Sequence, residues 1–575
     1  MDNETHAAGR EQPAVRVRDL TYRYRGQDKP ALEGVSLDVT RGEFVVVMGP
    51  SGAGKSTLCV SLNGLVPHFF RGRIDGEVRI NGRSTREGKV GEFAREVGLV
   101  FQDFEAQLFS TNVALEVAFG PENFSVEREE MVRRVEGVLG RVRLEGFEDR
   151  QPATLSGGQK QRLAIASVLA IEPRILCLDE PTTDLDPIGK LGVFEIAGEL
   201  KDRDDVTLIV VEHETEETLD ADRIVVLKDG MVIADRPARE VLRDVELLEE
   251  ARIMPLQITR FFHEMGLWQG QLPLTPEEGL KELRQRGWRI SPGRHRELVE
   301  KDAEREATYG GPIIEAEGLT HRYPNGVVAL EDVSLTVRRD EFLAVLGQNG
   351  SGKTTLVKHF NGLLEPTGGS VRVDGEDTVS QGVRGLGQKV GYVFQNPDHQ
   401  IFSDTVFDEV AFGPRVRELN EEDVKERVSE ALAAVGLEGY EQEDPFVLTK
   451  GERQRVAVAS VLAVRPEVLI LDEPTTGLDY AEQRSMMDLV RRLNESGSTI
   501  IVVTHTMWVV AEYAHRAVVV KDGRVTLSGT VRDVFAREEE LRDASLRPPH
   551  IVSMGNALGY TVLSVEEMIR VTGDK

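Results

Sequence analysis

Residues 49–57, Gly-Pro-Ser-Gly-Ala-Gly-Lys-Ser-Thr, have the residue types and the spacing of a loop that binds phosphate. An apolar run (44–48) precedes them and a helix-like segment (58–65) follows, so we predict a strand, a glycine-rich turn and a helix start. Backbone N–H groups and the helix dipole attract an anion in such a turn. Lys55 is expected to reach the β- and γ-phosphates of a nucleotide, and the Ser56 hydroxyl to contact Mg²⁺.

Two carboxylates follow another apolar run, residues 175–178. At the carboxyl end of a parallel strand, Asp179 suits an outer-shell contact with Mg²⁺. Glu180 suits the polarisation of a water that attacks the γ-phosphate. An isolated Asp-Glu pair after a strand is usually a solvated turn. The presence of a phosphate loop in the same half favours the catalytic interpretation.

The sequence repeats these features. Residues 347–355, Gly-Gln-Asn-Gly-Ser-Gly-Lys-Thr-Thr, restate the first loop, and Leu-Asp-Glu-Pro at 178–181 returns at 471–474. Val-Phe-Gln at 100–102 returns at 393–395. We therefore predict two homologous halves, each about the size of one α/β domain.

Composition narrows the class of protein. The chain has 575 residues, 40% of them apolar, and a formal net charge of −28, which disfavours a nucleic-acid backbone as the main partner. Cys59 and Cys177 belong to no metal-like cluster, so a structural zinc or a disulfide framework is not expected. The polar start of the chain does not resemble a signal peptide, and no apolar run approaches the ~20 residues that span a bilayer. Work at a membrane would therefore require a partner protein.

Strands alternate with helices in both halves, which predicts mainly parallel sheets with helices on both faces. Residues 15–20 and 35–39 resemble strands of an antiparallel edge, and residues 115–142 suggest a small helical subdomain. The other predicted elements of the first half are strands at 97–101, 175–178, 207–211 and 224–227 and helices at 158–169 and 188–200.

The segment between the halves, residues 237–311, is charged, is interrupted by prolines and is too long for a plain loop. Residues 251–255 match residues 544–548, and helix candidates follow both, at 276–285 and 565–571. We predict a small helical appendage after each half and a flexible tether at 297–306. The predicted order is a disordered N-terminus (1–13), a first α/β domain (14–237), an appendage (238–296), a linker (297–312), a second α/β domain (313–535) and a C-terminal appendage (536–575).

Residues 155–162, Leu-Ser-Gly-Gly-Gln-Lys-Gln-Arg, are the most specific stretch. Together with the repeated loops and acids, they make the chain resemble the tandem ATP-binding subunits of ABC transporters. The resemblance implies an α/β fold with two P-loop ATPase domains of ABC type, each with a mainly parallel sheet, an antiparallel edge subdomain and a helical subdomain. It also implies hydrolysis of ATP with Mg²⁺.

The resemblance assigns roles to matching residues. Tyr24 and Tyr323 would stack on adenine, and Asp186 and Asp479 lie in the loop that crosses to the opposite half. The expected catalytic residues are Glu180, Glu473, His213 and His505, of which the histidines would hold the γ-phosphate. The expected metal contacts are Ser56, Gln102, Asp179, Thr354, Gln395 and Asp472, and the two glutamines would also contact the membrane partner. The remaining expected ATP-binding residues are Gly49, Ser51, Gly52, Gly54, Lys55 and Thr57, then Gly347, Asn349, Gly350, Gly352, Lys353 and Thr355, and in the signatures Ser156, Gly157, Gly158, Gln159, Thr449, Gly451 and Glu452.

One phosphate loop covers one side of a nucleotide, and a second glycine-rich helix start can close the other side. In the family the two halves face each other head to tail, so each site would pair the loop of one half with the signature of the other. The second signature has Lys450 and Glu452 where the first has Gly157 and Gln159. A long side chain at Lys450 would crowd the phosphate. We therefore expect a stronger site at Lys353 and a weaker one at Lys55; tolerated drift with equal turnover is the alternative.

Residues 394–402, 101–109 and 62–68 are similar to segments of the energy-coupling-factor importers. Membership of that group implies an integral transmembrane coupling protein and a separate substrate-binding membrane protein as partners, at the cytoplasmic face of the cell membrane. It implies a vitamin, a vitamin precursor or a cobalt or nickel ion as cargo. Two alternatives are open: a soluble twin-ABC ATPase that acts on ribosomes or DNA, and the ATPase of another class of ABC importer.

Overall fold

The computed structural model describes residues 12–182, 185, 187–204, 206–266 and 271–573. The chain forms two compact units, residues 1–256 and 257–575. Residues 1–11 of the predicted disordered N-terminus, and Asp186, lie outside the described residues.

The main sheet of the first unit has the strand order β10-β9-β3-β8-β7-β6. Its strands are β3 (Phe44–Met48), β6 (Val97–Val100), β7 (Ile175–Asp179), β8 (Thr207–Val211), β9 (Arg223–Lys228) and β10 (Met231–Pro237). β10 is antiparallel to β9, and the other pairs are parallel. Every residue of β3, β7 and β8 is buried, as expected for strands that helices cover on both faces.

A second, antiparallel sheet of the first unit has the order β2-β1-β4-β5 and contains the predicted edge strands. Its strands are β1 (Val15–Tyr24), β2 (Leu32–Val39), β4 (Gly72–Ile80) and β5 (Arg83–Ser84). The helices of this unit are α1 (Lys55–Leu62), α2 (Leu65–His68), α3 (Val90–Phe93), α4 (Val113–Asn123), α5 (Arg128–Arg141), α6 (Gly157–Leu169), α7 (Pro187–Asp204), α8 (Ala238–Val241) and α9 (Val245–Glu250). Because α4 and α5 pack together and on α6, the predicted helical subdomain is confirmed.

The second unit repeats this architecture. Its main sheet has the order β17-β18-β19-β14-β20-β21, and its antiparallel sheet the order β13-β12-β15-β16. The strands are β12 (Pro312–Arg322), β13 (Val328–Arg338), β14 (Phe342–Leu346), β15 (Gly368–Val373), β16 (Glu376–Asp377), β17 (Val390–Val393), β18 (Val468–Asp472), β19 (Thr499–Val503), β20 (Arg516–Lys521) and β21 (Arg524–Thr530). The helices are α13 (Lys353–Phe360), α14 (Thr378–Lys389), α15 (Val406–Val416), α16 (Glu421–Val435), α17 (Lys450–Leu462), α18 (Tyr480–Glu495) and α19 (Met507–Tyr513).

The segment that joins the halves folds with the C-terminus of the chain. It contains α10 (Gln257–Glu264), α11 (Pro276–Arg286), β11 (Arg289–Ile290) and α12 (Pro292–Thr308), and the C-terminal region contains α20 (Val531–Phe535), α21 (Glu538–Asp543), α22 (His550–Ala557), α23 (Val565–Val571) and β22 (Thr572–Gly573). α10 packs on α22 and α23, α11 packs on α22, and β11 pairs with β22. A Cβ at Gly279 of α11 would lie 2.8 Å from the Met554 sulfur, so the helices approach closely.

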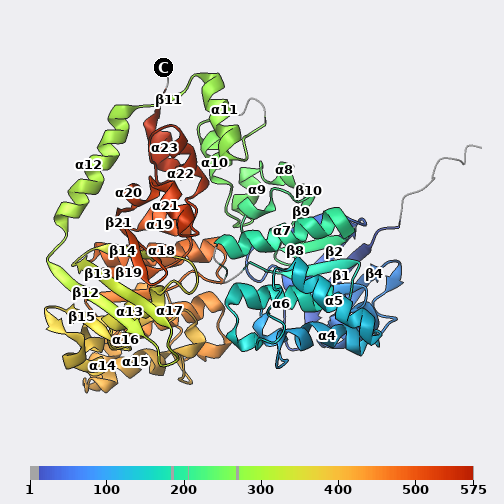
Figure 1. Cartoon of the computed structure of the whole chain (residues 1–575), viewed down its shortest axis with the longest axis horizontal. Coiled ribbons are helices and arrows are strands. Elements are labelled where there is room, and N and C mark those ends of the chain that lie inside the picture. Colours follow the sequence, from blue (N-terminus) through green and yellow to red (C-terminus); the bar gives the residue numbers. More distant parts are fainter. Residues whose placement is uncertain (1–11, 183–184, 186, 205, 267–270, 574–575) are drawn as a thin grey trace, which may run out of the picture. The chain divides into compact units, whose positions relative to one another are not determined.

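The expectation of a flexible tether at residues 297–306 is wrong, because these residues lie inside the helix α12. Ser291 caps this helix and Pro292 occupies its first turn, and both are ordinary helix-start signals. In Figure 1, α12 runs from β11 to the start of β12.

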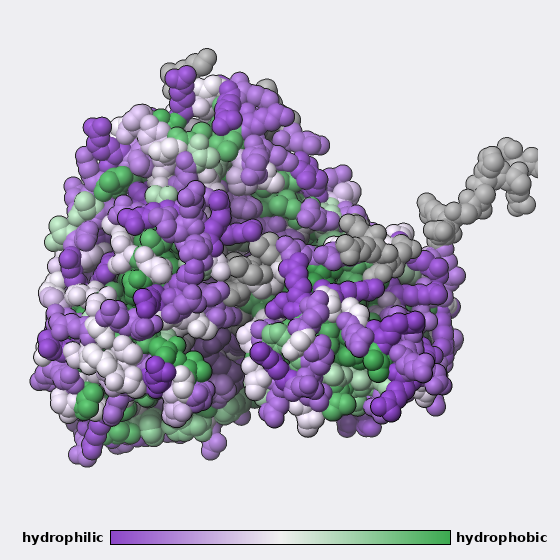
Figure 2. All heavy atoms as spheres, viewed as in Figure 1, coloured by the Kyte–Doolittle hydropathy of each residue, from purple (hydrophilic) through white to green (hydrophobic). Residues whose placement is uncertain are grey.

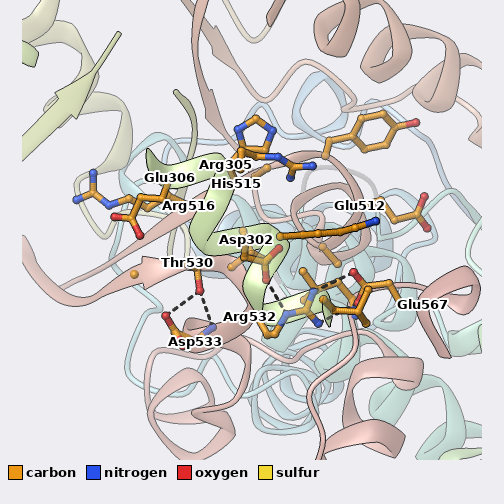
Figure 3. A pocket seen from close by; sticks show the side chains of 18 of the residues that line it. Asp302, Arg305, Glu306, Glu512, His515, Arg516, Thr530, Arg532, Asp533 and Glu567 are labelled. Carbon is orange, nitrogen blue, oxygen red and sulfur yellow. Dashed lines mark hydrogen bonds and ion pairs between the residues drawn. The ribbon is translucent and has the colours of Figure 1, made fainter. Parts of the chain in front are cut away.

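A cavity of about 550 Å³ lies beside α12, lined by residues of α12, α19, α20 and α23 among others. Arg532, whose side chain is 6% exposed, forms ion pairs there with Asp302 of α12 and Glu567 of α23 (Figure 3). This network ties the linker helix, the second α/β domain and the C-terminal appendage together. None of the residues that line the cavity is a predicted nucleotide-binding residue.

Among the described residues, no helix combines the length and the apolar character that crossing a membrane requires. Polar side chains predominate on the face shown in Figure 2, and apolar residues lie in small patches between them.

Candidate nucleotide-binding sites

The loops between β3 and α1 and between β14 and α13 have backbones that require glycine. At Gly49, with φ 152°, an added Cβ would lie 2.1 Å from the Leu227 carbonyl oxygen. At Gly347 it would lie 2.2 Å from the Val520 carbonyl oxygen. Each loop is therefore packed tightly against the strand beside it in the sheet, β9 in the first unit and β20 in the second. Such a glycine-rich loop can direct backbone N–H groups to a phosphate. The predicted residues Ser51, Gly52, Gly54, Asn349, Gly350 and Gly352 lie in these loops.

The loop lysines occupy equivalent positions. Lys55 Nζ donates to the carbonyl oxygens of Gly49 and Pro50, both at 2.9 Å. Lys353 Nζ donates to those of Gly347 at 2.8 Å and Gln348 at 3.0 Å. Each buried ammonium is therefore held at the loop where a phosphate would bind.

In the first unit, the predicted catalytic residues lie together. Glu180 accepts a hydrogen bond from Gln102 Nε2 at 2.6 Å and lies 2.6 Å from His213 Nε2. Burial raises the pKa of the neighbouring Asp179 to about 6, against a hydrogen bond from Ser56 that favours the charged form. The expected grouping of acid, histidine and glutamine is present within this unit.

In the second unit, both oxygens of the Asp472 carboxylate have donors. Thr354 Oγ1 donates to Oδ1 at 3.3 Å, and the Tyr392 hydroxyl donates to Oδ2 at 2.6 Å. Burial raises the pKa of Asp472 above its usual range. Tyr392 cannot be identified from the sequence alone, because an aromatic residue in an apolar strand is typical of a core residue.

Glu473 lies 2.9 Å from His505 Nδ1. Burial alone would raise the pKa of Glu473, but the neighbouring His505 and Lys353 outweigh it, and the pKa lies below its usual range. Glu473 is therefore a carboxylate that can polarise a water. Both glutamines are exposed, but Gln395 differs from its counterpart Gln102, which donates to Glu180, because the side chain of Gln395 makes no hydrogen bond among the described residues.

The tyrosines expected at adenine contact the loop helices. The hydroxyls of Tyr24 and Thr57 lie 3.1 Å apart, as do those of Tyr323 and Thr355. Each tyrosine is thereby fixed beside the helix that begins at the loop lysine.

The signature segments begin helices. The Ser156 side chain accepts from the Gln159 backbone N–H at the start of α6, and the Gln159 side chain accepts from the Ser156 backbone N–H. Thr449 and Glu452 form the same capping box at the start of α17. A Cβ at Gly157 would meet nothing within 4 Å, so the first signature presents an open backbone. Gly158 and Gly451 follow in the first turns of the two helices.

In the second signature, the side chain of Lys450 folds toward its own domain. Its Nζ lies 2.1 Å from where a Cβ would stand on Gly477. Asp479, expected in the loop that crosses to the other half, caps α18 by accepting from the Glu482 backbone N–H at 2.9 Å.

The residues present fit a nucleotide with Mg²⁺. Asp179 Oδ1, Ser351 Oγ and Glu473 Oε2 are buried and have no hydrogen-bond partner among the described residues. Buried polar atoms normally have partners, so these atoms point to a polar ligand. Carboxylate and hydroxyl oxygens beside a phosphate loop are the donors that Mg²⁺ uses with nucleotides.

Comparison with known proteins agrees with this geometry. A family model described as "ABC transporter" matches residues 32–183 and 330–476. A Caldanaerobacter subterraneus protein, provisionally named ABC transporter ATP-binding protein TTE1589, is 60% identical over 558 residues, which cover 97% of this chain and 98% of the relative. A Methanosarcina acetivorans protein with the same provisional description is 43% identical over 549 residues, covering 93% of this chain and 89% of the relative.

Among solved structures, cbiO1 from Clostridium perfringens, described as part of the ABC transporter complex cbiONQ, is 39% identical, with a TM-score of 0.38 over 42% of this chain and 97% of that one. The family model and the full-length relatives establish the family. The chain belongs to the ATP-binding proteins of ABC transporters, and it carries two copies of their ATPase domain.

Proposed function

We propose that this ATPase powers import of a vitamin, a vitamin precursor or a transition-metal ion through a separate membrane complex of the energy-coupling-factor type. The observation that carries the proposal is the packing of the two appendages on each other, α10 and α11 against α22 and α23. Helices in this position help to join the ATPase subunits of that group, which the chain resembles in its glutamine loops.

Two composite ATP sites follow from the proposed head-to-tail pairing of the halves. Lys353, Glu473 and His505 would act with the signature of residues 156–159. Lys55, Glu180 and His213 would act with that of residues 449–452, and Asp186 and Asp479 would contact the opposite half. Each loop binds the phosphates, each glutamate polarises a water, and each histidine holds the γ-phosphate, so that positioning and charge carry the barrier reduction.

Mg²⁺ would be held by Ser56, Asp179 and Gln102 in one site and by Thr354, Asp472 and Gln395 in the other. When bound, Mg²⁺ neutralises charge on the β- and γ-phosphates. The Glu–His contacts at 2.6 and 2.9 Å keep each histidine at the edge of the sheet where the γ-phosphate would arrive.

Exposed aromatic pairs favour contact with a membrane protein. Phe109 and Phe119 are 63% and 46% exposed, with ring centroids 4.6 Å apart. Phe402 and Phe412 repeat this arrangement, 60% and 50% exposed and 4.8 Å apart. These pairs follow the glutamine loops, and exposed apolar groups mark interaction sites. We place the transmembrane coupling protein on these two surfaces, which puts the chain at the cytoplasmic face of the membrane.

Purification of the complex in mild detergent tests this proposal. We expect integral membrane proteins and a retained small molecule to copurify with the chain, and fewer of them with a Phe109→Ser, Phe402→Ser double variant that still hydrolyses ATP. If the chain instead sediments with ribosomes and no membrane protein copurifies, it is a soluble twin-ABC ATPase. If the membrane proteins are those of another importer class, the energy-coupling-factor assignment is wrong.

The two sites should differ in turnover because Lys450 replaces a signature glycine only in the weaker one. We expect Glu473→Gln to remove most of the ATPase rate, leaving that of the weaker site, and Glu180→Gln to remove a minor part. The test measures the steady-state ATPase rates of the two variants, prepared in the same way, relative to the wild type. Equal losses would contradict unequal sites.

A further inference from the structure

We infer that Tyr392 is a positioning residue for Asp472 and so for the metal at the second ATP site, a role that the first site lacks. The inference rests on the proposed contact of Asp472 with Mg²⁺. It concerns the hydroxyl of Tyr392, which no other part of the proposed mechanism uses.

The contact is built into the sheet. Tyr392 of β17 lies directly beside Ile470 of β18, two residues before Asp472. Its side chain is buried, and its ring meets that of Phe394 edge to face at 5.0 Å. The ring cannot turn away without disturbing the core, so the hydroxyl is held at 2.6 Å from Asp472 Oδ2.

Tyr392 and Thr354 each donate to a different oxygen of the Asp472 carboxylate. Tyr392 takes Oδ2, and Thr354, itself an expected metal contact, takes Oδ1 at the longer distance of 3.3 Å. A hydrogen bond to a charged acceptor is stronger than one between neutral groups. The tyrosine therefore fixes the rotation of the carboxylate and leaves Oδ1 turned toward the loop where a metal would bind.

The first unit has the same sheet register without the donor. Leu99 of β6 lies beside Cys177 of β7, two residues before Asp179, in the place that Tyr392 has in the second unit. Leucine has no hydrogen-bonding group, and Asp179 Oδ1 is buried without a partner among the described residues. Preorganisation of the acid by a neighbouring strand thus belongs to one site alone.

Groups that orient a metal contact typically change metal affinity 10- to 100-fold when removed. The test uses Mn²⁺ in place of Mg²⁺, so that binding is read from the electron paramagnetic resonance signal of free Mn²⁺ without turnover. Lys55→Ala silences nucleotide binding at the first loop, and a non-hydrolysable ATP analogue fills the second. In this background we expect Tyr392→Phe to weaken Mn²⁺ binding about tenfold.

Tyr513→Phe is the matched control. Tyr513 is 4% exposed and donates to Asp488 Oδ1 at 2.9 Å in the same unit, so its loss also removes one tyrosine hydrogen bond to an acid, a partly buried one. Both variants should lower the melting temperature slightly, and only Tyr392→Phe should change Mn²⁺ affinity. Equal weakening by the control, or a change below twofold in Tyr392→Phe, would overturn the inference.

Asp472→Asn separates this inference from the proposal on which it rests. Tyr392→Phe should have no further effect in an Asp472→Asn background, since the tyrosine acts through the acid. If Asp472→Asn itself leaves Mn²⁺ affinity unchanged, the metal role of Asp472 fails and the inference fails with it. If Asp472→Asn weakens binding and Tyr392→Phe does not, only the role of Tyr392 fails.

Discussion

Glu180 and Glu473 both have φ 49°, in the left-handed region that glutamate seldom adopts. Such a conformation costs of order 1 kcal/mol and persists where the surrounding structure imposes it. In both halves it directs the carboxylate to a histidine, at 2.6 and 2.9 Å. The same strained backbone at both strand ends is a residue-scale argument for the catalytic role of the two acids.

A buried histidine predicts acid sensitivity of the second unit. Burial lowers the pKa of His359 to about 4, and that of His515 also to about 4. An unfolded histidine has a pKa near 6.5, so between about pH 6.5 and 4 the unfolded chain binds more protons than the folded one. Stability contributed by each neutral histidine is therefore lost as the pH falls through that window, by up to about 3 kcal/mol each.

We expect His359→Gln to be less stable than wild type at pH 7 and to lose less stability than wild type between pH 7 and 4. Calorimetric melting of the second unit at several pH values measures this slope. His295→Gln serves as a control, because His295 is only partly buried, beside the Thr561 carbonyl oxygen, and is not a core residue. A slope equal to that of wild type in His359→Gln would contradict the assignment.

Sequence motifs predict candidate residues where the chemistry constrains the local chain. The glycines of residues 49–54 and the acids after β7 and β18 stand in spacings that few other structures need. Tyr392 could not be found in this way, because its partner Asp472 lies 80 residues further along the chain. The contact between the two side chains depends on which strands are neighbours in the sheet. The role of a residue that acts across a sheet follows only from the sheet order.

At the scale of elements, α12 is the clearest difference between expectation and structure. Its charged sequence resembles a linker, and its burial is slight, with Leu298 as the buried residue. The position of α12 depends on contacts with distant residues. Arg532, for example, bonds Asp302 of α12 from 230 residues further along the chain. The strands and helices that the sequence predicts in the first half follow local patterns of apolar residues, and they lie within a few residues of their predicted positions.

We expect Arg532→Met to destabilise the second unit by about 2 kcal/mol, because Asp302 and Glu567 lose a buried partner. Both acids are 23% exposed, so water compensates part of the loss. Urea unfolding measures the change. The matched control is Arg570→Met, which removes an ion pair between side chains that are 42% and 56% exposed and should cost less than about 0.5 kcal/mol. Similar small losses in both variants would contradict a structural role of the Arg532 network (Figure 3).

At the scale of the whole molecule, the repeat predicts two ATPase domains, and the pairing of their sites rests on the resemblance to the family. The head-to-tail proposal gives Lys450 and Glu452 an effect at a distance: they should limit the site that contains Lys55 and Glu180. No pattern within one half could indicate this, since each half contains a complete set of loop, acid and histidine.

We expect Lys450→Gly with Glu452→Gln to raise turnover at the weaker site about tenfold, equivalent to ~1.4 kcal/mol of barrier. The Glu473→Gln background isolates that site for a steady-state ATPase measurement. In a Glu180→Gln background the same pair of changes should leave the rate unaltered. A gain in the Glu180→Gln background, or none in the Glu473→Gln background, would refute the proposed exchange of signatures between the halves.

The shared body of the two appendages bears on how the gene can be divided. Ile258, Phe261 and Phe262 of α10 are fully buried in the core of the second unit. If the chain were divided at residues 309–311, these apolar side chains would become exposed to solvent. The amino-terminal fragment would then tend to aggregate. Division into residues 1–256 and 257–575 keeps each hydrophobic core intact. We therefore expect that division to give two polypeptides that fold and stay in solution.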